Sequence, residues 1–224
     1  MKPLAFVALL GSLCLPAAAA ITTVSTVDDG EFLVTTPGVF SEQAGNANGI
    51  TLNLVEGTAN GEPFFQTGTR FGIMDFSLAS VPAGATITGA VVTVTVNNTT
   101  GTVANPAALR TRVRAGDGVV GFSDALAVYT PDVFTNVTAA GPIAISLNAL
   151  LPEVNLIADN ADFITVYTAI AYGNTGESAR FNSLETAVGV PQLTVTYDLA
   201  IVPEPTSLAL LSLGGLALLR RRQA

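Results

Sequence analysis

Turn-forming residues divide most of this chain into short, strand-like segments. Between residues 21 and 197, Gly, Pro, Asn and Asp recur at intervals of roughly 8 to 15 residues, and the segments between them are rich in Val, Thr, Ile and Phe. In residues 86–96, Ala90, Val92 and Val94 share one face of an extended strand, whereas Thr93 and Thr95 share the other. This pattern predicts an all-β fold, in the form of an antiparallel two-sheet sandwich resembling a jelly roll.

Further strand candidates follow from the same composition and spacing. They are residues 22–27, 32–35, 50–55, 71–76, 109–114, 126–130, 143–147, 163–171 and 192–197. Helical periodicity is weak except over residues 147–158, where Pro152 would break or restart a helix. We therefore expect a body made almost entirely of strands.

The N-terminus has the three parts of a secretory signal peptide. Lys2 precedes an apolar run over residues 4–15, and the small residues 16–20 provide an Ala-x-Ala site. We predict a signal helix in residues 1–20 that is removed after Ala20; a buried core helix is the alternative. Cys14 is the one cysteine, so the mature chain can form no disulfide and must gain its stability from a hydrophobic core.

The charge of the body limits its partners. Residues 21–198 contain five basic and sixteen acidic residues, which gives a net charge of −11. Such a surface repels phosphate backbones, so we predict no nucleic-acid partner.

The residue types also limit the chemistry. The chain has no histidine, and the predicted mature body has neither cysteine nor lysine. Ser-His-Asp and Cys-His nucleophiles, ordinary zinc sites and Schiff-base chemistry therefore lack their essential residues. We predict a protein that is not an enzyme and has no catalytic residues; glycoside hydrolysis by two facing carboxylates is the alternative.

Two acidic clusters are candidates for calcium, the one cofactor that the sequence suggests. They comprise Asp28, Asp29 and Glu31, and Asp159 and Asp162. Clustered carboxylates suit an oxygen-ligated ion on an exported protein. Neither cluster matches an EF-hand loop, and solvated Asp-rich turns are the alternative.

Cationic and aromatic residues offer two further surfaces. Arg110, Arg112 and Arg114 recur at a period of two and so share one face of a strand. Internal ion pairs and contact with an anionic polysaccharide are the two interpretations. Phe64 and Phe65 lie between Gly and Pro residues, where they form either an exposed sugar-stacking platform or a buried loop anchor.

The C-terminus combines a short motif, an apolar segment and a basic end. Pro203, Glu204 and Pro205 form the motif, and Pro favours an extended, protease-accessible backbone. The predicted membrane anchor comprises Leu208, Leu210, Leu211, Leu213, Leu216, Leu218, Leu219, Arg220, Arg221 and Arg222. An apolar helix over residues 207–219 is about 20 Å long, shorter than a hydrocarbon core of about 30 Å. A packed helix is the alternative, but a basic flank is typical of the cytoplasmic end of a membrane span.

This order of parts resembles the PEP-CTERM sorting signal, also labelled an ice-binding protein C-terminal domain. The resemblance implies that the exported precursor is held in the inner membrane by a single helix until an exosortase processes it near the motif. It also implies a final location at the cell surface or in the extracellular matrix. The resulting organisation is a signal peptide (1–20), a β-sandwich domain (21–198) and a sorting tail (199–224), with its motif at 202–207.

The body resembles the disaggregatase-related repeat domains, which are β-sandwich modules of secreted and carbohydrate-associated surface proteins. Arg70, the segment 75–91 and the closing segments 181–185 and 191–197 carry the resemblance, and Ser77 stands where those domains usually have Asp. It implies a non-catalytic exported protein that associates with extracellular polysaccharide. A carboxylate-dependent glycan-active enzyme and a purely structural or adhesive surface protein are the alternatives.

Overall fold

The computed structural model describes residues 19–36, 39–42, 51–55, 70–125, 131–170, 178–186 and 188–199. Most of the predicted signal peptide, the predicted strand at 126–130, Phe64, Phe65 and residues 200–224 lie outside these ranges.

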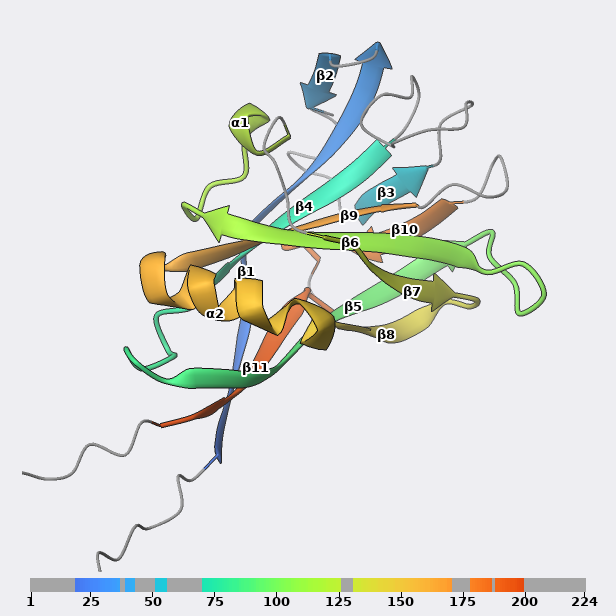
Figure 1. The fold of residues 1–224 in the computed structure, drawn as a ribbon. Coiled ribbons are helices and arrows are strands. Elements are labelled where there is room, and N and C mark those ends of the chain that lie inside the picture. Colours follow the sequence, from blue (N-terminus) through green and yellow to red (C-terminus); the bar gives the residue numbers. More distant parts are fainter. Residues whose placement is uncertain are drawn as a thin grey trace, which may run out of the picture.

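The predicted all-β, antiparallel fold is confirmed (Figure 1). The strands are β1 (Ala19–Thr36), β2 (Val39–Glu42), β3 (Thr51–Val55), β4 (Arg70–Ser77), β5 (Thr86–Thr99), β6 (Ala107–Gly116), β7 (Val133–Val137), β8 (Gly141–Ser146), β9 (Phe163–Ile170), β10 (Ser178–Asn182) and β11 (Gln192–Asp198). The helical elements are α1 (Phe122–Ala125), η3 (Asn148–Leu150) and α2 (Leu151–Asn160).

The long first strand joins the two layers of the fold into one sheet. Its first half pairs with β11 from Ala19 to Ser25, and its second half pairs with β4 as far as Leu33. The register shifts between Thr26 and Asp28, where the strand passes from one partner to the other. Within the described residues, the two predicted sheets are therefore a single eleven-stranded antiparallel sheet, which carries one large and one smaller hydrophobic cluster.

The main core lies between these two layers. Val92, Val94 and Val96 of β5 are at most 1% exposed, which confirms the buried face predicted from their alternation. They belong to the same hydrophobic cluster as Val113 of β6 and Val166 of β9 on the opposite layer. Burial of such side chains contributes about 1.5–3 kcal/mol each relative to exposure.

Helix α2 packs against β5, β6 and β9 and contributes to this core. Pro152 lies in its first turn, so this residue starts the helix and does not break it. Val154 and Ile157 are buried, while the Asn155 side chain accepts a hydrogen bond from the Ile87 amide (2.7 Å) and donates one to the Ile87 carbonyl (2.9 Å). These two bonds fix the helix at the start of β5.

The ends of the body lie side by side. Ala19 of β1 pairs with Asp198 of β11, so the start of the first strand and the end of the last strand lie at the same end of the described body (Figure 1). The predicted signal cleavage falls inside β1. A mature chain starting at Ile21 would still pair with β11 as far as Ser25.

Several strands differ from the sequence prediction. The predicted break between 22–27 and 32–35 is wrong, because β1 continues through Asp28, Asp29 and Glu31. These carboxylates find partners elsewhere in the fold, so they are tolerated in the middle of a strand. Strands β2, β7 and β10 were not among the strand candidates, and each has only four or five residues.

Gly101 offers a test of the close packing between the end of β5 and the β6–β7 pair. A Cβ atom there would lie 2.2 Å from the Val137 carbonyl oxygen and 2.4 Å from the Ala107 nitrogen. We expect Gly101→Ala to lower the free energy of unfolding by about 2 kcal/mol or more, measured by chemical denaturation. Gly121→Ala is the control, because the nearest atom to its Cβ is 3.9 Å away. Equal stability of the two variants would contradict this packing.

Candidate functional site

The arginine stripe on β6 is neutralised by carboxylates from its own fold. Arg110 and Arg112 both pair with Asp132, the former at 2.6 Å, and Arg114 pairs with Asp124 at 2.7 Å. The interpretation of the stripe as internal ion pairs is therefore confirmed. Burial raises the pKa of Asp132, but hydrogen bonds and charge from the two arginines outweigh this effect, so its pKa lies below the ordinary value.

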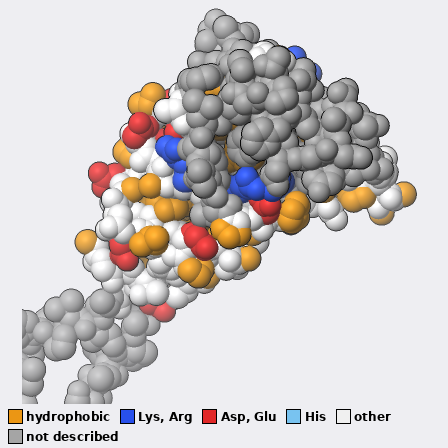
Figure 2. All heavy atoms as spheres, turned by 45° about the horizontal axis from the view of Figure 1, so that its top comes forward, with side chains coloured by type: hydrophobic (Ala, Val, Ile, Leu, Met, Phe, Trp, Pro, Cys, Tyr) orange, Lys and Arg blue, Asp and Glu red, His pale blue; other side chains and the backbone are white. Residues whose placement is uncertain are grey.

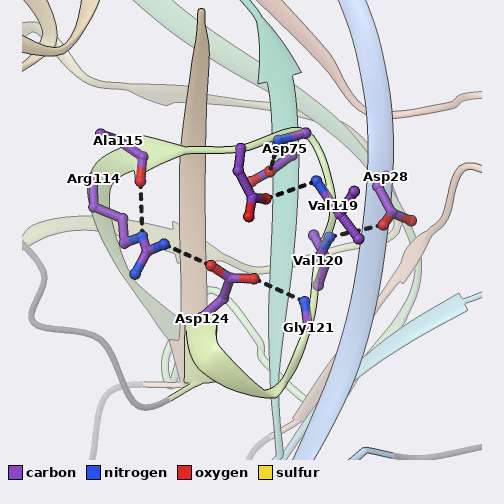
Figure 3. Close-up of polar contacts among 10 residues, drawn as sticks. Asp28, Asp75, Arg114, Ala115, Val119, Val120, Gly121 and Asp124 are labelled. Carbon is purple, nitrogen blue, oxygen red and sulfur yellow. Dashed lines mark hydrogen bonds and ion pairs between the residues drawn. The ribbon is translucent and has the colours of Figure 1, made fainter. Parts of the chain in front are cut away.

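The loop that follows β6 is held by an unusual set of bonds. Four consecutive amides, from Gly118 to Gly121, each donate a hydrogen bond to an aspartate, and Figure 3 shows this arrangement around the loop. In chain order the acceptors are Asp75 (3.0 Å), Asp117 (3.0 Å), Asp28 (2.8 Å) and Asp124 (2.8 Å). Asp28, Asp75 and Asp124 lie outside residues 117–121, and Asp117 lies within them. We call residues 117–121 the carboxylate-held loop.

Asp75 is the most deeply buried of these carboxylates. It is 0% exposed, and burial is the main reason that its pKa is raised, with the negative charges of Asp124 and Asp117 adding to the effect. The Thr165 hydroxyl and the Gly118 amide lower the pKa in part. Asp75 Oδ1 and Thr165 Oγ1 nevertheless both lack a hydrogen bond of good geometry.

The first predicted calcium cluster is divided by the strand that carries it. Successive residues of a strand point to opposite faces, so Asp28 bonds the Val120 amide, whereas Asp29 accepts a 2.6 Å hydrogen bond from the Leu184 amide. Glu31 forms an ion pair with Arg70 at 2.9 Å. The three carboxylates therefore serve three separate contacts.

The second predicted cluster lies at the end of α2. Asp159 and Asp162 are both exposed. Among the described residues, no group of three or more His, Cys, Asp or Glu is placed to hold a metal ion. Calcium binding stays a prediction.

An aromatic cluster occupies the face of the sheet next to the arginine stripe. Phe71 stacks with Phe32 at a centroid distance of 5.7 Å and contacts Tyr167 at 5.0 Å. All three rings are 0% exposed, and Tyr197 is also buried at 8%. These rings stabilise the fold and are not available for stacking on a sugar.

The carboxylate-held loop was not predicted from the sequence. Its partners Asp75 and Asp28 lie 43 and 92 residues from the amides that they bind. The one local signal was the Asp117-Gly118 pair, since Gly118 adopts a φ of +86°, a conformation that favours glycine.

Residues 202–223 match the PEP-CTERM protein-sorting motif. The match covers the predicted motif, apolar segment and basic end, and it indicates an exported protein that an exosortase recognises and processes at the membrane. No curated protein matches this chain.

Within the described ranges, no helix is both long and apolar enough to cross a membrane. The predicted anchor helix at residues 207–219 falls outside those ranges.

Asp29 gives the first test of these electrostatics. Burial is the main cause that raises its pKa from 3.8 to about 7, the Leu184 amide lowers it in part, and Glu185 and Asp28 raise it further. The folded protein thus binds this proton more tightly than the unfolded chain, so the free energy of unfolding contributed here falls as the pH rises from about 4 to 7, by on the order of a few kcal/mol.

We expect Asp29→Asn to remove that dependence while keeping an acceptor for the Leu184 amide. Denaturation at several pH values should show a flatter profile for this variant than for the wild type. The exposed Asp162→Asn is the matched control for the loss of one carboxylate charge. Parallel profiles for wild type and Asp29→Asn would refute the assignment.

Asp132 should behave in the opposite way. Its pKa is lowered, so its contribution to stability is present above the ordinary value and is lost as the pH falls through the folded value. Asp132→Asn leaves Arg110 and Arg112 without their shared carboxylate, and we expect a loss of about 2–4 kcal/mol near pH 7 that shrinks in acid. Thermal unfolding between neutral and acidic pH measures this; a loss that does not change with pH would contradict it.

Proposed function

We propose that this chain is a non-catalytic protein of the cell surface or extracellular matrix, and that its β body associates with polysaccharide after exosortase processing. The observation that carries the proposal is the position of the sorting motif. The motif match begins at residue 202, only four residues after the last strand residue, Asp198. Four residues span at most about 14 Å, so processing near the motif releases a folded body with almost no tail.

The use of the carboxylates supports a non-catalytic role. Asp75 and Asp124 are at most 1% exposed, and both bond amides of the carboxylate-held loop. A glycoside hydrolase needs two carboxylates facing each other across a cleft that admits the sugar. Asp124 forms an ion pair with Arg114, whereas burial is the main cause that raises the pKa of Asp75. This difference between the two carboxylates favours the glycan-active enzyme as the second candidate. Their burial favours a structural use instead.

The surface charge bears on the choice of polysaccharide. On the face shown in Figure 2, acidic side chains are scattered among hydrophobic and uncharged ones, and some basic side chains are also exposed. The arginines of β6 are already paired with Asp132 and Asp124. A polyanion would therefore meet repulsion over most of the body. We propose that binding requires no cofactor, with calcium as a condition to be tested.

The experiment expresses the full chain in a host that contains an exosortase. We expect the wild type in the surface or matrix fraction, and the chain lacking residues 208–224 to be lost from that fraction. Glu204→Ala should accumulate in the membrane as an unprocessed precursor, whereas Gln223→Ala is the matched control and should behave as wild type. Unchanged distribution of the truncated chain would contradict the sorting role.

The polysaccharide association needs a separate measurement. The protein recovered from the matrix should co-sediment with the host's purified extracellular polysaccharide, with and without a calcium chelator. Retention in both conditions supports the proposal. Release of shortened sugar products would instead favour the enzyme, and absence of co-sedimentation would leave a purely structural protein.

A further inference from the structure

The outer face of one layer is uncharged and rich in hydroxyl groups. Four neighbouring strands form this layer, namely β8, β5, β11 and the first half of β1 (Figure 1). Their outward positions alternate with the core residues of the same strands. We call the following residues the hydroxyl face: Ile21, Thr23, Ser25, Val91, Thr93, Ala144, Ser146, Gln192, Thr194 and Thr196. All ten are exposed or half-buried.

Strand register places these side chains in rows across the sheet. Thr23 lies opposite Thr194, which lies opposite Val91, and Val91 lies opposite Ser146. The next row runs from Ser25 through Gln192 and Thr93 to Ala144. Neighbouring strands are about 4.7–4.9 Å apart, and outward residues of one strand repeat at about 6.6–6.8 Å. The face is therefore a regular two-dimensional array of short polar and apolar groups.

The absence of charge on this face contrasts with the rest of the body. None of the ten residues is ionisable, although residues 21–198 carry a net charge of −11. On β11 the outward residues are Gln192, Thr194, Thr196 and Asp198, so the first acidic side chain on this side of the strand lies at its end. Covering the hydroxyl face thus removes no ion from water, which is the main cost of covering other parts of a charged surface.

This inference rests on the proposed association with polysaccharide. We propose that the hydroxyl face is the polysaccharide-binding surface and that its ligand is an uncharged polysaccharide. Sugar hydroxyls can exchange hydrogen bonds with Thr, Ser and Gln, while Ile21 and Val91 contact the apolar faces of the sugar rings. The absence of charge on the face is the deciding argument, because the surrounding acids repel a polyanion, whereas a neutral polymer covers the face without that repulsion.

The same charge argument disfavours other occupants. Two copies meeting through this face would bring two bodies of charge −11 together, at an energetic cost that rises at low salt. An anionic lipid surface would need basic side chains, and the face has none among its ten residues.

The test uses the mature protein and the host's extracellular polysaccharide, separated by anion exchange into a neutral and an acidic fraction. We expect co-sedimentation with the neutral fraction, unchanged between about 50 and 500 mM NaCl because no ion pairs form. Thr194→Glu places a charge at the centre of the face and should weaken binding at least tenfold. Thr138→Glu, at an exposed position after β7, is the matched control and should bind as wild type.

A milder variant guards against loss of folding. The double variant Thr93→Val and Thr196→Val keeps the side-chain shape and strand preference, removes two hydroxyls and spares the hydrogen bond between the Thr23 and Thr194 hydroxyls (3.0 Å). We expect binding several-fold weaker with an unchanged melting temperature. Binding to the acidic fraction alone, or wild-type affinity of both face variants, would refute the hydroxyl face as the binding surface but would leave the proposed polysaccharide association intact.

Binding to neither fraction would refute both the binding surface and the proposed association. Salt-dependent dimerisation that is lost in Thr194→Glu would show instead that the face binds a second copy of the chain.

Discussion

The pairing of β1 with two different strands is the constraint on which the rest of the structure depends. Its first half completes one layer through β11 and its second half completes the other through β4, so one strand closes the sheet around the core. With no disulfide available to the predicted mature chain, this continuity and the apolar core must hold the fold together. The same pairing brings Ala19 beside Asp198, so the end of the body next to the predicted signal peptide and the end next to the sorting motif lie side by side.

The two layers differ in how they use polar residues. On the layer of β4, β9 and β6, carboxylates and arginines are drawn inward, where they pair with each other and with the amides of the carboxylate-held loop. Most of these groups are partly or fully buried, and their contacts fix the loop and the edge of the strand. Removing one partner is destabilising, because it leaves a buried charge uncompensated. On the layer of β5 and β11, ionisable groups are absent from the hydroxyl face. This division gives an acidic protein one surface that a neutral polymer can cover.

The sequence predicted what depends on local pattern and missed what depends on distant partners. The alternation around Val92 and Val94 and the restart of a helix at Pro152 are local, and both agree with the structure. The acidic run at Asp28 and Asp29 suggested a turn, but it lies within β1 because its partners are the Val120 and Leu184 amides, 92 and 155 residues away. No composition or periodicity signals such contacts. The sorting tail was predictable because its three parts are contiguous, and the motif at residues 202–223 confirms it.

The central claim is that an exosortase processes this exported chain and leaves the folded β body at the cell surface. Mass spectrometry of the protein recovered from the surface of an exosortase-containing host tests it most directly, because it measures both ends of the same molecule. The account predicts an N-terminus at Ile21 and a C-terminus close to Pro203, Glu204 and Pro205. Recovery of a surface protein that still ends in Arg220, Arg221, Arg222, Gln223 and Ala224 would contradict it.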